Sequence, residues 1–251
     1  MASESEALLE ALVALHGAMK RQGPGDDALT RRLIERLPRL PGKPRVADLG
    51  CGTGASAFVL AEMLGVPIDC VDASADFVAI LEARAAALGL GHLIRGRVGD
   101  MATYRHPDGP LNLLWSEGAA YHLTFPGALS TWRPILNPGG FAVISELTWF
   151  KTDRPTNVEA FWAATYPQLA DEATNIVTAQ ASGFEVLFTE RLPSNAWREN
   201  YYGPLSARAD ELSAEASEAM RGVIEETRRE IALFEEADES FGYTFYGLKA
   251  V

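Results

Sequence analysis

A carboxylate and three glycines are grouped in the segment Val46–Gly54. Asp48 ends an apolar run, and Gly50, Gly52 and Gly54 follow it at alternate positions. Glycine has no Cβ, so this backbone can turn sharply and approach a ligand closely. An apolar stretch typical of a helix comes next, and a helix N-terminus offers unpaired N–H groups to a ligand. The segment therefore predicts a loop that binds a nucleotide-like cofactor.

Two cofactor classes fit this loop. Read with Ala55, the first two glycines match the G-x-G-x-x-G/A dinucleotide pattern, and Asp72 lies about the right distance downstream for a ribose hydroxyl. Alternatively, Asp48 suits a cofactor with a cationic amino group, because that group needs a carboxylate. A nicotinamide cofactor fits less well, since it leaves Asp48 and Asp100 without a role and prefers its third glycine one residue after Gly54.

Three further acidic residues follow later apolar strands. Asp72 follows the second predicted strand, Asp100 the third and Glu117 the fourth. Open α/β sheets bind ligands at the carboxyl ends of their parallel strands, so we expect these side chains to share a site. A carboxylate also suits a ribose diol, because it has two acceptor oxygens. A purely structural role is also open, because Asp72 could serve merely as a cap of the helix that begins near Ser74.

Strands and helices alternate through the chain and imply a parallel sheet with helices on both faces. The predicted strands lie near 45–49, 67–71, 93–98, 111–115, 141–147, 184–192 and 242–250, the helices at 54–64, 74–88 and 125–136, and a turn at 137–140. We expect an α/β fold with a seven-stranded sheet. Residues 1–43 are predicted to form an N-terminal helical lid, and 44–251 one domain with a helical insertion at about 151–182.

Composition limits the class of partner. The net charge of −12 would repel nucleic acid and anionic membrane, so we expect neither as a partner. The two cysteines, Cys51 and Cys70, have no metal-ligand or disulfide spacing, and we predict no metal site. The acidic N-terminus and the lack of a long apolar run predict a cytoplasmic protein.

With these motifs in order, residues 44–147 resemble the class I S-adenosylmethionine (SAM)-dependent methyltransferases. The resemblance implies a Rossmann-like, mostly parallel sheet whose last strand is antiparallel. It also implies that Asp48 helps to bind the amino group of the methionine part, Asp72 the ribose hydroxyls and Asp100 the adenine amino group, while Met101 packs on the ring. The cofactor-binding set that it implies is Asp48, Gly50, Cys51, Gly52, Gly54, Asp72, Ala73, Asp100, Met101 and Glu117.

Methyl transfer from a sulfonium needs alignment, exclusion of water and, for protonated acceptors, a base. By position, the catalytic candidates are Glu117, Tyr121 and His122, with Glu146 as a further acid. Each could instead be structural: Glu117 as part of the cofactor site, Tyr121 by packing, His122 as a core histidine and Glu146 as the partner of a buried cation.

Substrate choice depends on the segments added to this core. The lid helices, the insertion and Trp197–Tyr202 are our candidates for the substrate pocket, with Arg154 and Arg198 near enough to suit an aromatic or acidic acceptor. Tyr201 and Tyr202 could equally well close the core. The motifs of amino-methylating DNA enzymes, arginine methyltransferases and metal-dependent catechol enzymes are missing.

The resemblance is greatest to the methyltransferases grouped with ubiquinone and menaquinone biosynthesis. We therefore predict methyl transfer from SAM to a small molecule by direct displacement, without metal. The alternatives are a catalytically silent SAM-binding regulatory or scaffolding protein and, less favoured, an NAD(P)-dependent oxidoreductase. The chain could also pair with a second copy of itself as a homodimer.

Overall fold

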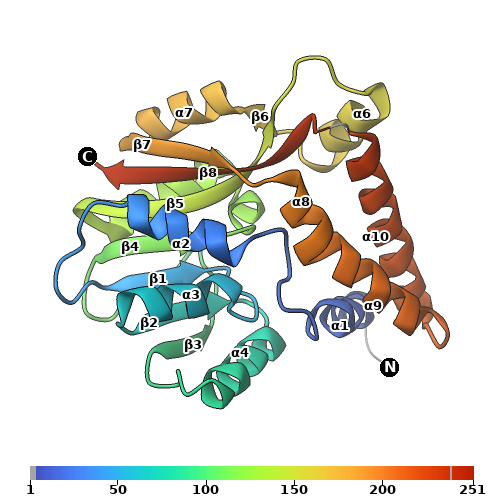
Figure 1. Ribbon diagram of the computed structural model, residues 1–251, viewed down its shortest axis with the longest axis horizontal. Coiled ribbons are helices and arrows are strands. Elements are labelled where there is room, and N and C mark those ends of the chain that lie inside the picture. Colours follow the sequence, from blue (N-terminus) through green and yellow to red (C-terminus); the bar gives the residue numbers. More distant parts are fainter. Residues whose placement is uncertain (1–3, 238) are drawn as a thin grey trace.

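The computed structural model describes residues 4–237 and 239–251 and contains one mixed sheet with helices on both faces (Figure 1). The strand order is β3-β2-β1-β4-β5-β8-β7, with the short β6 paired to the end of β5. The strands from β1 to β5 are parallel, while β8 is antiparallel to both β5 and β7. This is the Rossmann-like topology that the sequence predicts, including the antiparallel last strand.

The elements agree with the predicted ranges to within a few residues. The strands are β1 Val46–Leu49, β2 Ile68–Asp72, β3 Ile94–Val98, β4 Leu111–Ser116, β5 Leu136–Trp149, β6 Ala170–Asp171, β7 Phe184–Arg191 and β8 Phe241–Ala250. The α-helices are α1 Glu4–His16, α2 Asp27–Arg36, α3 Ala55–Leu64, α4 Ala75–Ala87, α5 Phe125–Trp132, α6 Thr156–Thr165, α7 Glu172–Ala181, α8 Ser194–Trp197, α9 Gly203–Ser213 and α10 Glu218–Glu236. The 3₁₀ turns η1 and η2 span Ala120–Leu123 and Arg133–Ile135, and a π-helical turn, η3, spans Arg198–Tyr202.

Alternate residues of the strands enter two separate cores. Val46 of β1 faces a core shared with α2, α3 and α4, whereas Ala47 faces a core shared with α5 and α7. Because both faces are covered, the central strands are apolar on both sides, as in other parallel sheets. Burial on both faces fixes the register of the strands and therefore the place where each strand ends.

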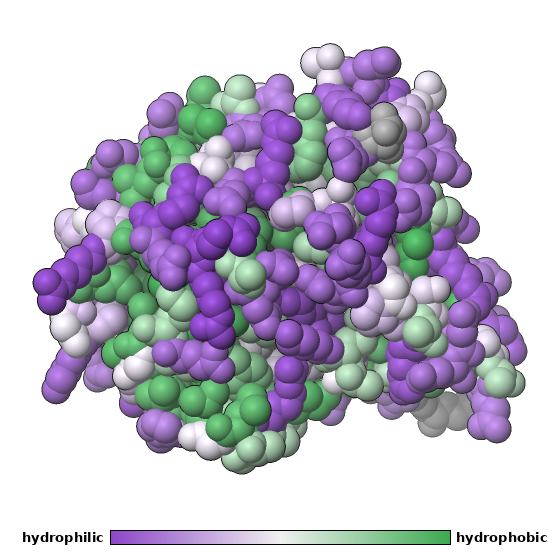
Figure 2. Space-filling view, viewed as in Figure 1, coloured by the Kyte–Doolittle hydropathy of each residue, from purple (hydrophilic) through white to green (hydrophobic). Residues whose placement is uncertain are grey.

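Helices α1, α9 and α10 pack together at the end of the sheet toward which the parallel strands run (Figure 1). Hydrophilic residues cover most of the face in view, while hydrophobic residues gather around α3 and α4 (Figure 2). Within residues 4–237 and 239–251, no helix combines the length and the apolar character that crossing a membrane requires.

Two local predictions need correction. The predicted turn at 137–140 lies inside β5, as an irregularity in its pairing with β4: Leu111 pairs with Leu136, but Leu113 pairs with Phe141. The sheet also has an eighth strand, the two-residue β6, within the predicted insertion. The same insertion contains α7, which packs on the sheet beside α5.

Candidate cofactor-binding site

The loop after β1 is held in shape by Asp72, at the end of the neighbouring strand β2. One carboxylate oxygen of Asp72 accepts a hydrogen bond from the N–H of Gly52 at 2.9 Å, and the other accepts one from the N–H of Ser74 at 2.9 Å. Ser74, and not Asp72, caps α4, because its hydroxyl accepts from the N–H of Phe77. Each oxygen of Asp72 keeps acceptor capacity for a ligand, since a carboxylate oxygen can accept more than one hydrogen bond.

All three loop glycines meet close neighbours, and at Gly50, where φ is +76°, an added Cβ would clash with the Cβ of Ala119. At Gly52 the backbone has φ +53°, and an added Cβ would lie 2.7 Å from Oε1 of Gln22. At Gly54 φ is +91°, and an added Cβ would clash with a methyl group of Leu81. Side chains other than glycine are strained at such φ values. Gly54 therefore lets α3 begin against α4.

A cavity of about 780 Å³ opens above this loop, at the carboxyl ends of β1 to β4. Most of the predicted cofactor-binding residues line it, namely Gly50, Cys51, Gly52, Asp72, Ala73, Asp100, Met101 and Glu117. Asp48 and Gly54 are the two members of that set that do not. Strand ends far apart in the sequence thus contribute to one cavity, as the predicted topology requires.

Asp48 lies beneath the loop and is fully buried. Within the described part of the chain, neither of its carboxylate oxygens has a hydrogen-bond partner of good geometry, although the nearby Ser56 side chain partly lowers its pKa. Burial, with a further contribution from the charge of Glu117, raises the pKa of Asp48 to about 8. A buried carboxyl without a partner is costly, and such a group favours either a proton or a cation nearby.

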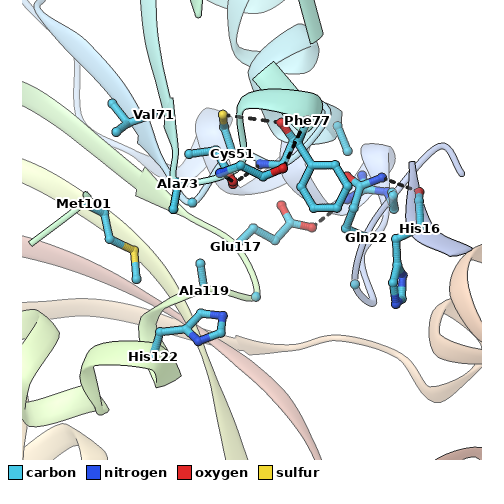
Figure 3. Close-up of a pocket in the computed structure, with 18 of the residues that line it drawn as sticks. His16, Gln22, Cys51, Val71, Ala73, Phe77, Met101, Glu117, Ala119 and His122 are labelled. Carbon is cyan, nitrogen blue, oxygen red and sulfur yellow. Dashed lines mark hydrogen bonds and ion pairs between the residues drawn. The ribbon is translucent and has the colours of Figure 1, made fainter. Parts of the chain in front are cut away.

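Glu117 follows β4 and lies in the cavity between the glycine loop and His122 (Figure 3). Its Oε1 is 2.7 Å from Nη1 of Arg21, and the side chains of both residues are 5% exposed. Burial raises the pKa of Glu117 even though Arg21 pairs with it. The predicted catalytic residue is therefore already one half of a buried ion pair.

The other two predicted catalytic residues, Tyr121 and His122, lie on η1 and line the same cavity. Their ring centroids are 4.0 Å apart. Partial desolvation lowers the pKa of His122 below its ordinary value of 6.5, so its imidazole is neutral at neutral pH and can accept a proton.

A second imidazole, that of His16 at the end of α1, reaches the cavity from another element (Figure 3). It stacks on Tyr201 with ring centroids 6.3 Å apart, and its Nδ1 has no hydrogen-bond partner within the described residues. Burial lowers the pKa of His16 as well. The sequence analysis did not identify this histidine.

Glu146, the further acidic candidate, does not line the cavity. It lies on β5 with 2% of its surface exposed, and burial raises its pKa to about 8. A hydrogen bond with Tyr166 lowers the pKa of Glu146, but by less than burial raises it. Glu146 has no cationic partner among the described residues, which contradicts its possible role as the partner of a buried cation.

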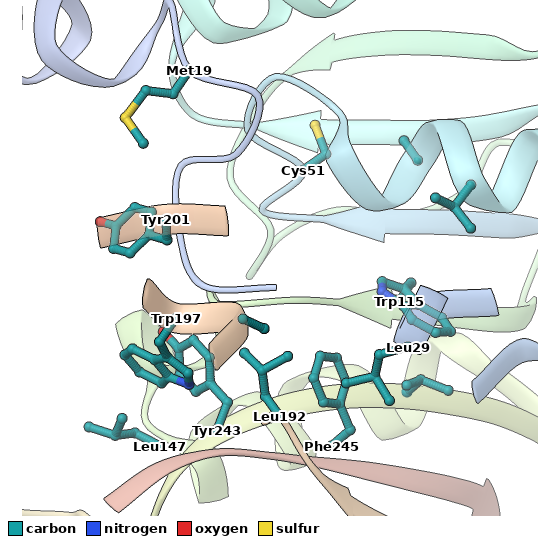
Figure 4. Close-up of a cluster of buried hydrophobic side chains, with 14 of the residues drawn as sticks. Met19, Leu29, Cys51, Trp115, Leu147, Leu192, Trp197, Tyr201, Tyr243 and Phe245 are labelled. Carbon is teal, nitrogen blue, oxygen red and sulfur yellow. The ribbon is translucent and has the colours of Figure 1, made fainter. Parts of the chain in front are cut away.

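The predicted substrate segment Trp197–Tyr202 divides between two environments. Tyr201 lines the cavity, whereas Trp197 packs in a buried cluster of hydrophobic side chains (Figure 4). Tyr202 belongs to the same cluster and contacts Trp197. Arg198 pairs instead with Glu235, and Arg154 with Glu159. The expectation that these two arginines serve the substrate pocket is therefore wrong, because neither lines the cavity.

The N-terminal segment contributes cavity residues that the sequence analysis missed. Besides Arg21, Gln22 enters the site, and its Oε1 accepts hydrogen bonds from the N–H and the hydroxyl of Thr53 at 2.9 and 3.0 Å. Both residues immediately precede the Gly23-Pro24-Gly25 break between α1 and α2. Two polar side chains at a break beside apolar helices are the only signal of this role in the sequence.

Comparison with known proteins agrees with this geometry. Residues 46–140, less than half of the chain, match a family model described as "Methyltransferase domain". Phosphoethanolamine N-methyltransferase 1 of Arabidopsis thaliana is 30% identical over 118 residues, which are 47% of this chain and 23% of that protein. The chain thus spans about a quarter of the length of the curated relatives that it matches.

Solved structures match over nearly the whole chain. A SAM-dependent methyltransferase from Thiobacillus denitrificans, in complex with S-adenosyl-L-homocysteine, superposes with a TM-score of 0.81 at 21% identity, covering 95% of this chain and 97% of that one. The [4+2]-cyclase SpnF superposes with a TM-score of 0.75 at 21% identity, covering 98% of this chain and 94% of that one. At these identities the likeness establishes the fold. The match to the methyltransferase-domain model is confined to residues 46–140.

Proposed function

We propose that this chain transfers the methyl group of SAM to a small-molecule acceptor by direct displacement. The observation that carries the proposal is the buried, unpartnered carboxyl of Asp48 beneath a glycine loop whose cavity is lined by acids from three other strand ends. SAM carries a cationic amino group and a sulfonium, so a cavity of negative potential suits it. The cofactor would supply an electrophilic methyl group bonded to positively charged sulfur.

The residues of the loop and the strand ends fit the rest of this cofactor. Asp72 would hold the ribose hydroxyls with the acceptor capacity that its two backbone hydrogen bonds leave. Asp100 and Met101 would meet the adenine, and Asp48 together with Glu117 would favour the ammonium group of the methionine part. Ala73 would pack beside the ribose.

The remaining walls of the cavity define the acceptor side. Leu9, Leu12 and Val13 of α1 form an apolar wall, and Tyr121 and Tyr201 add aromatic surface. These walls would exclude water and align an acceptor with an apolar or aromatic part, which is most of what a displacement requires. Neutral imidazoles at His122 and His16 are placed to remove a proton from the acceptor.

The curated relatives are named as phosphoethanolamine N-methyltransferases, but a phosphorylated acceptor suits this cavity poorly. Among the described residues that line it, Arg21 is the only lysine or arginine, and Glu117 already pairs with it. We therefore favour an acceptor without phosphate. The apolar wall supports our prediction of a relation to the ubiquinone and menaquinone group, which stays a prediction, as do the homodimer and the cytoplasmic location.

The test begins with calorimetric titration of SAM, S-adenosylhomocysteine and NADH, followed by an assay for methylated products on a panel of apolar metabolites. Binding of both sulfur ligands with methylation of at least one acceptor would support the proposal. Tight binding with no turnover on any acceptor would favour a SAM-binding regulatory or scaffolding protein. Binding of NADH alone would favour the oxidoreductase.

A further inference from the structure

Arg21 contributes the single fixed positive charge of the cavity, counted over the described lining residues. It lies in the connection between α1 and α2, and its side chain is 5% exposed. Nη1 bonds Glu117 and Nη2 bonds Asp27, so the guanidinium is held from two sides. A guanidinium has more N–H donors than these two bonds use, which leaves donors for a ligand.

The backbone around Arg21 is also fixed to the core. Gln22, the next residue, bonds Thr53 in the glycine loop, and Arg84 of α4 bonds both the carbonyl oxygen of Thr53 and that of Lys20. On the other side, the backbone of Gly25 packs so closely against the ion pair that an added Cβ would clash with Oε1 of Glu117. The guanidinium is thus held at a defined place beside the glycine loop.

The remaining charges of this site are acidic. Asp72, Asp100 and Glu117 attract a cation and repel a carboxylate, and Asp48 joins them when an approaching cation displaces its proton. The methionine part of SAM is a zwitterion, with a carboxylate on the same carbon atom as the ammonium group. A site that attracts only the ammonium group would leave that carboxylate among like charges, so a fixed cation within reach would stabilise the bound zwitterion.

We infer that Arg21 binds the carboxylate of the cofactor's methionine part, with Glu117 and Asp27 as its positioning residues. This inference rests on the proposed function. Guanidinium and carboxylate are complementary because they can form two parallel hydrogen bonds. The arrangement makes the N-terminal lid part of the cofactor site and makes binding depend on an intact amino-acid group. Nucleosides that lack this group gain nothing from Arg21.

The test compares two ligands that differ in the amino-acid part. S-Adenosylhomocysteine has it, and 5′-methylthioadenosine lacks it, while both share the adenine, ribose and sulfur. Calorimetry on the full chain would measure both affinities for the wild type, for Arg21→Gln and for the matched control Lys20→Gln. Lys20 is the neighbouring cation, is exposed and pairs with the same Asp27, but it does not line the cavity.

We expect Arg21→Gln to lower the affinity for S-adenosylhomocysteine about 10-fold to 100-fold, the loss typical of a charge-assisted hydrogen bond. The affinity for 5′-methylthioadenosine should change by less than about twofold. Lys20→Gln should leave both affinities unchanged. Equal losses for the two ligands would mean that Arg21 only supports the fold, and no loss would mean that it does not touch the carboxylate. Either result overturns the inference.

A measurement on the wild type guards against a variant that folds poorly. Decarboxylated SAM keeps the ammonium group but lacks the carboxylate, so it should bind at least about 10-fold more weakly than SAM. Equal affinities would overturn the inference without any substitution. If the wild type binds none of these adenosine derivatives, the proposed function fails, which is a different result from a loss of discrimination between them.

Discussion

Nη1 of Arg21 lies 2.7 Å from Oε1 of Glu117, and this contact joins the connection between α1 and α2 to the residue that follows β4. The two residues are 96 positions apart in the sequence. Because both side chains are buried, the pair is shielded from solvent and from salt. The contact therefore links the packing of the N-terminal helices to the geometry of the cavity.

The first prediction concerns the stability of this pair. Arg21→Gln leaves a buried carboxylate without its partner, and we expect a loss of roughly 3 kcal/mol in the free energy of unfolding. The double variant Arg21→Gln, Glu117→Gln removes both charges and should be more stable than Arg21→Gln alone. Urea unfolding of the wild type, both single variants and the double variant would measure the coupling. If the two substitutions change the free energy of unfolding additively, the predicted coupling between Arg21 and Glu117 is wrong.

The second prediction concerns the pH dependence that Asp48 creates. Its pKa is about 8 in the folded protein and near the ordinary value of 3.8 when unfolded. The folded state thus holds a proton that the unfolded state releases, so this group's contribution to stability falls as the pH rises from about 4 to about 8. Asp48→Asn removes the effect. The free energy of unfolding of the variant should exceed that of the wild type by a margin that grows by at most about 1.4 kcal/mol per pH unit.

The same substitution, Asp48→Asn, should also weaken cofactor binding. Unlike the carboxyl, the amide cannot ionise to pair with the ammonium group, so we expect weaker binding of S-adenosylhomocysteine together with greater stability at pH 8. Glu146→Gln is the matched control, because Glu146 has a similarly raised pKa but lies outside the cavity. It should shift stability in the same direction and leave the affinity unchanged. A parallel loss of affinity in both variants would argue against a cofactor role for Asp48.

Much of the site follows from local sequence, and the reason is geometric. Asp72, Asp100 and Glu117 each lie at the end of a strand or within two residues after it, so predicting the strand also places the acid at the common edge of the sheet. The same logic predicts the glycine loop. Burial on both faces then leaves little freedom in register, which is why the predicted strand ranges are close to those of the structure.

The rest depends on contacts between distant segments. The pairing of Arg21 with Glu117 and of Gln22 with Thr53 is decided by how α1 and the connection to α2 pack, and no local pattern encodes that packing. In the Asn137–Gly140 segment, by contrast, a local pattern is present but predicts the wrong structure. Its composition is typical of a turn, yet pairing with β4 on both sides makes it an irregularity within β5.

The third prediction assigns a base. If His122 removes a proton from the acceptor, the rate should fall at low pH with a pKa below 6.5, because desolvation lowers that of His122. His122→Gln should abolish this limb of the profile and lower kcat by roughly 10²-fold to 10⁴-fold. His92→Gln, in an exposed turn, is the control. If the fall in rate at low pH persists in His122→Gln but disappears in His16→Gln, the base is His16 of α1.

The last prediction tests the placement of the ribose. Asp72→Ala removes a carboxylate that both orders the loop at Gly52 and would accept from the ribose hydroxyls, so affinity for S-adenosylhomocysteine should fall by about 1–3 kcal/mol. Asp76→Ala, four residues later on the exposed side of α4, changes the same charge outside the cavity and should have no such effect. Calorimetry with adenosine separates the contributions: because adenosine keeps the ribose, it should lose affinity in Asp72→Ala by a similar factor. If adenosine and S-adenosylhomocysteine both bind as tightly as in the wild type, the ribose lies elsewhere.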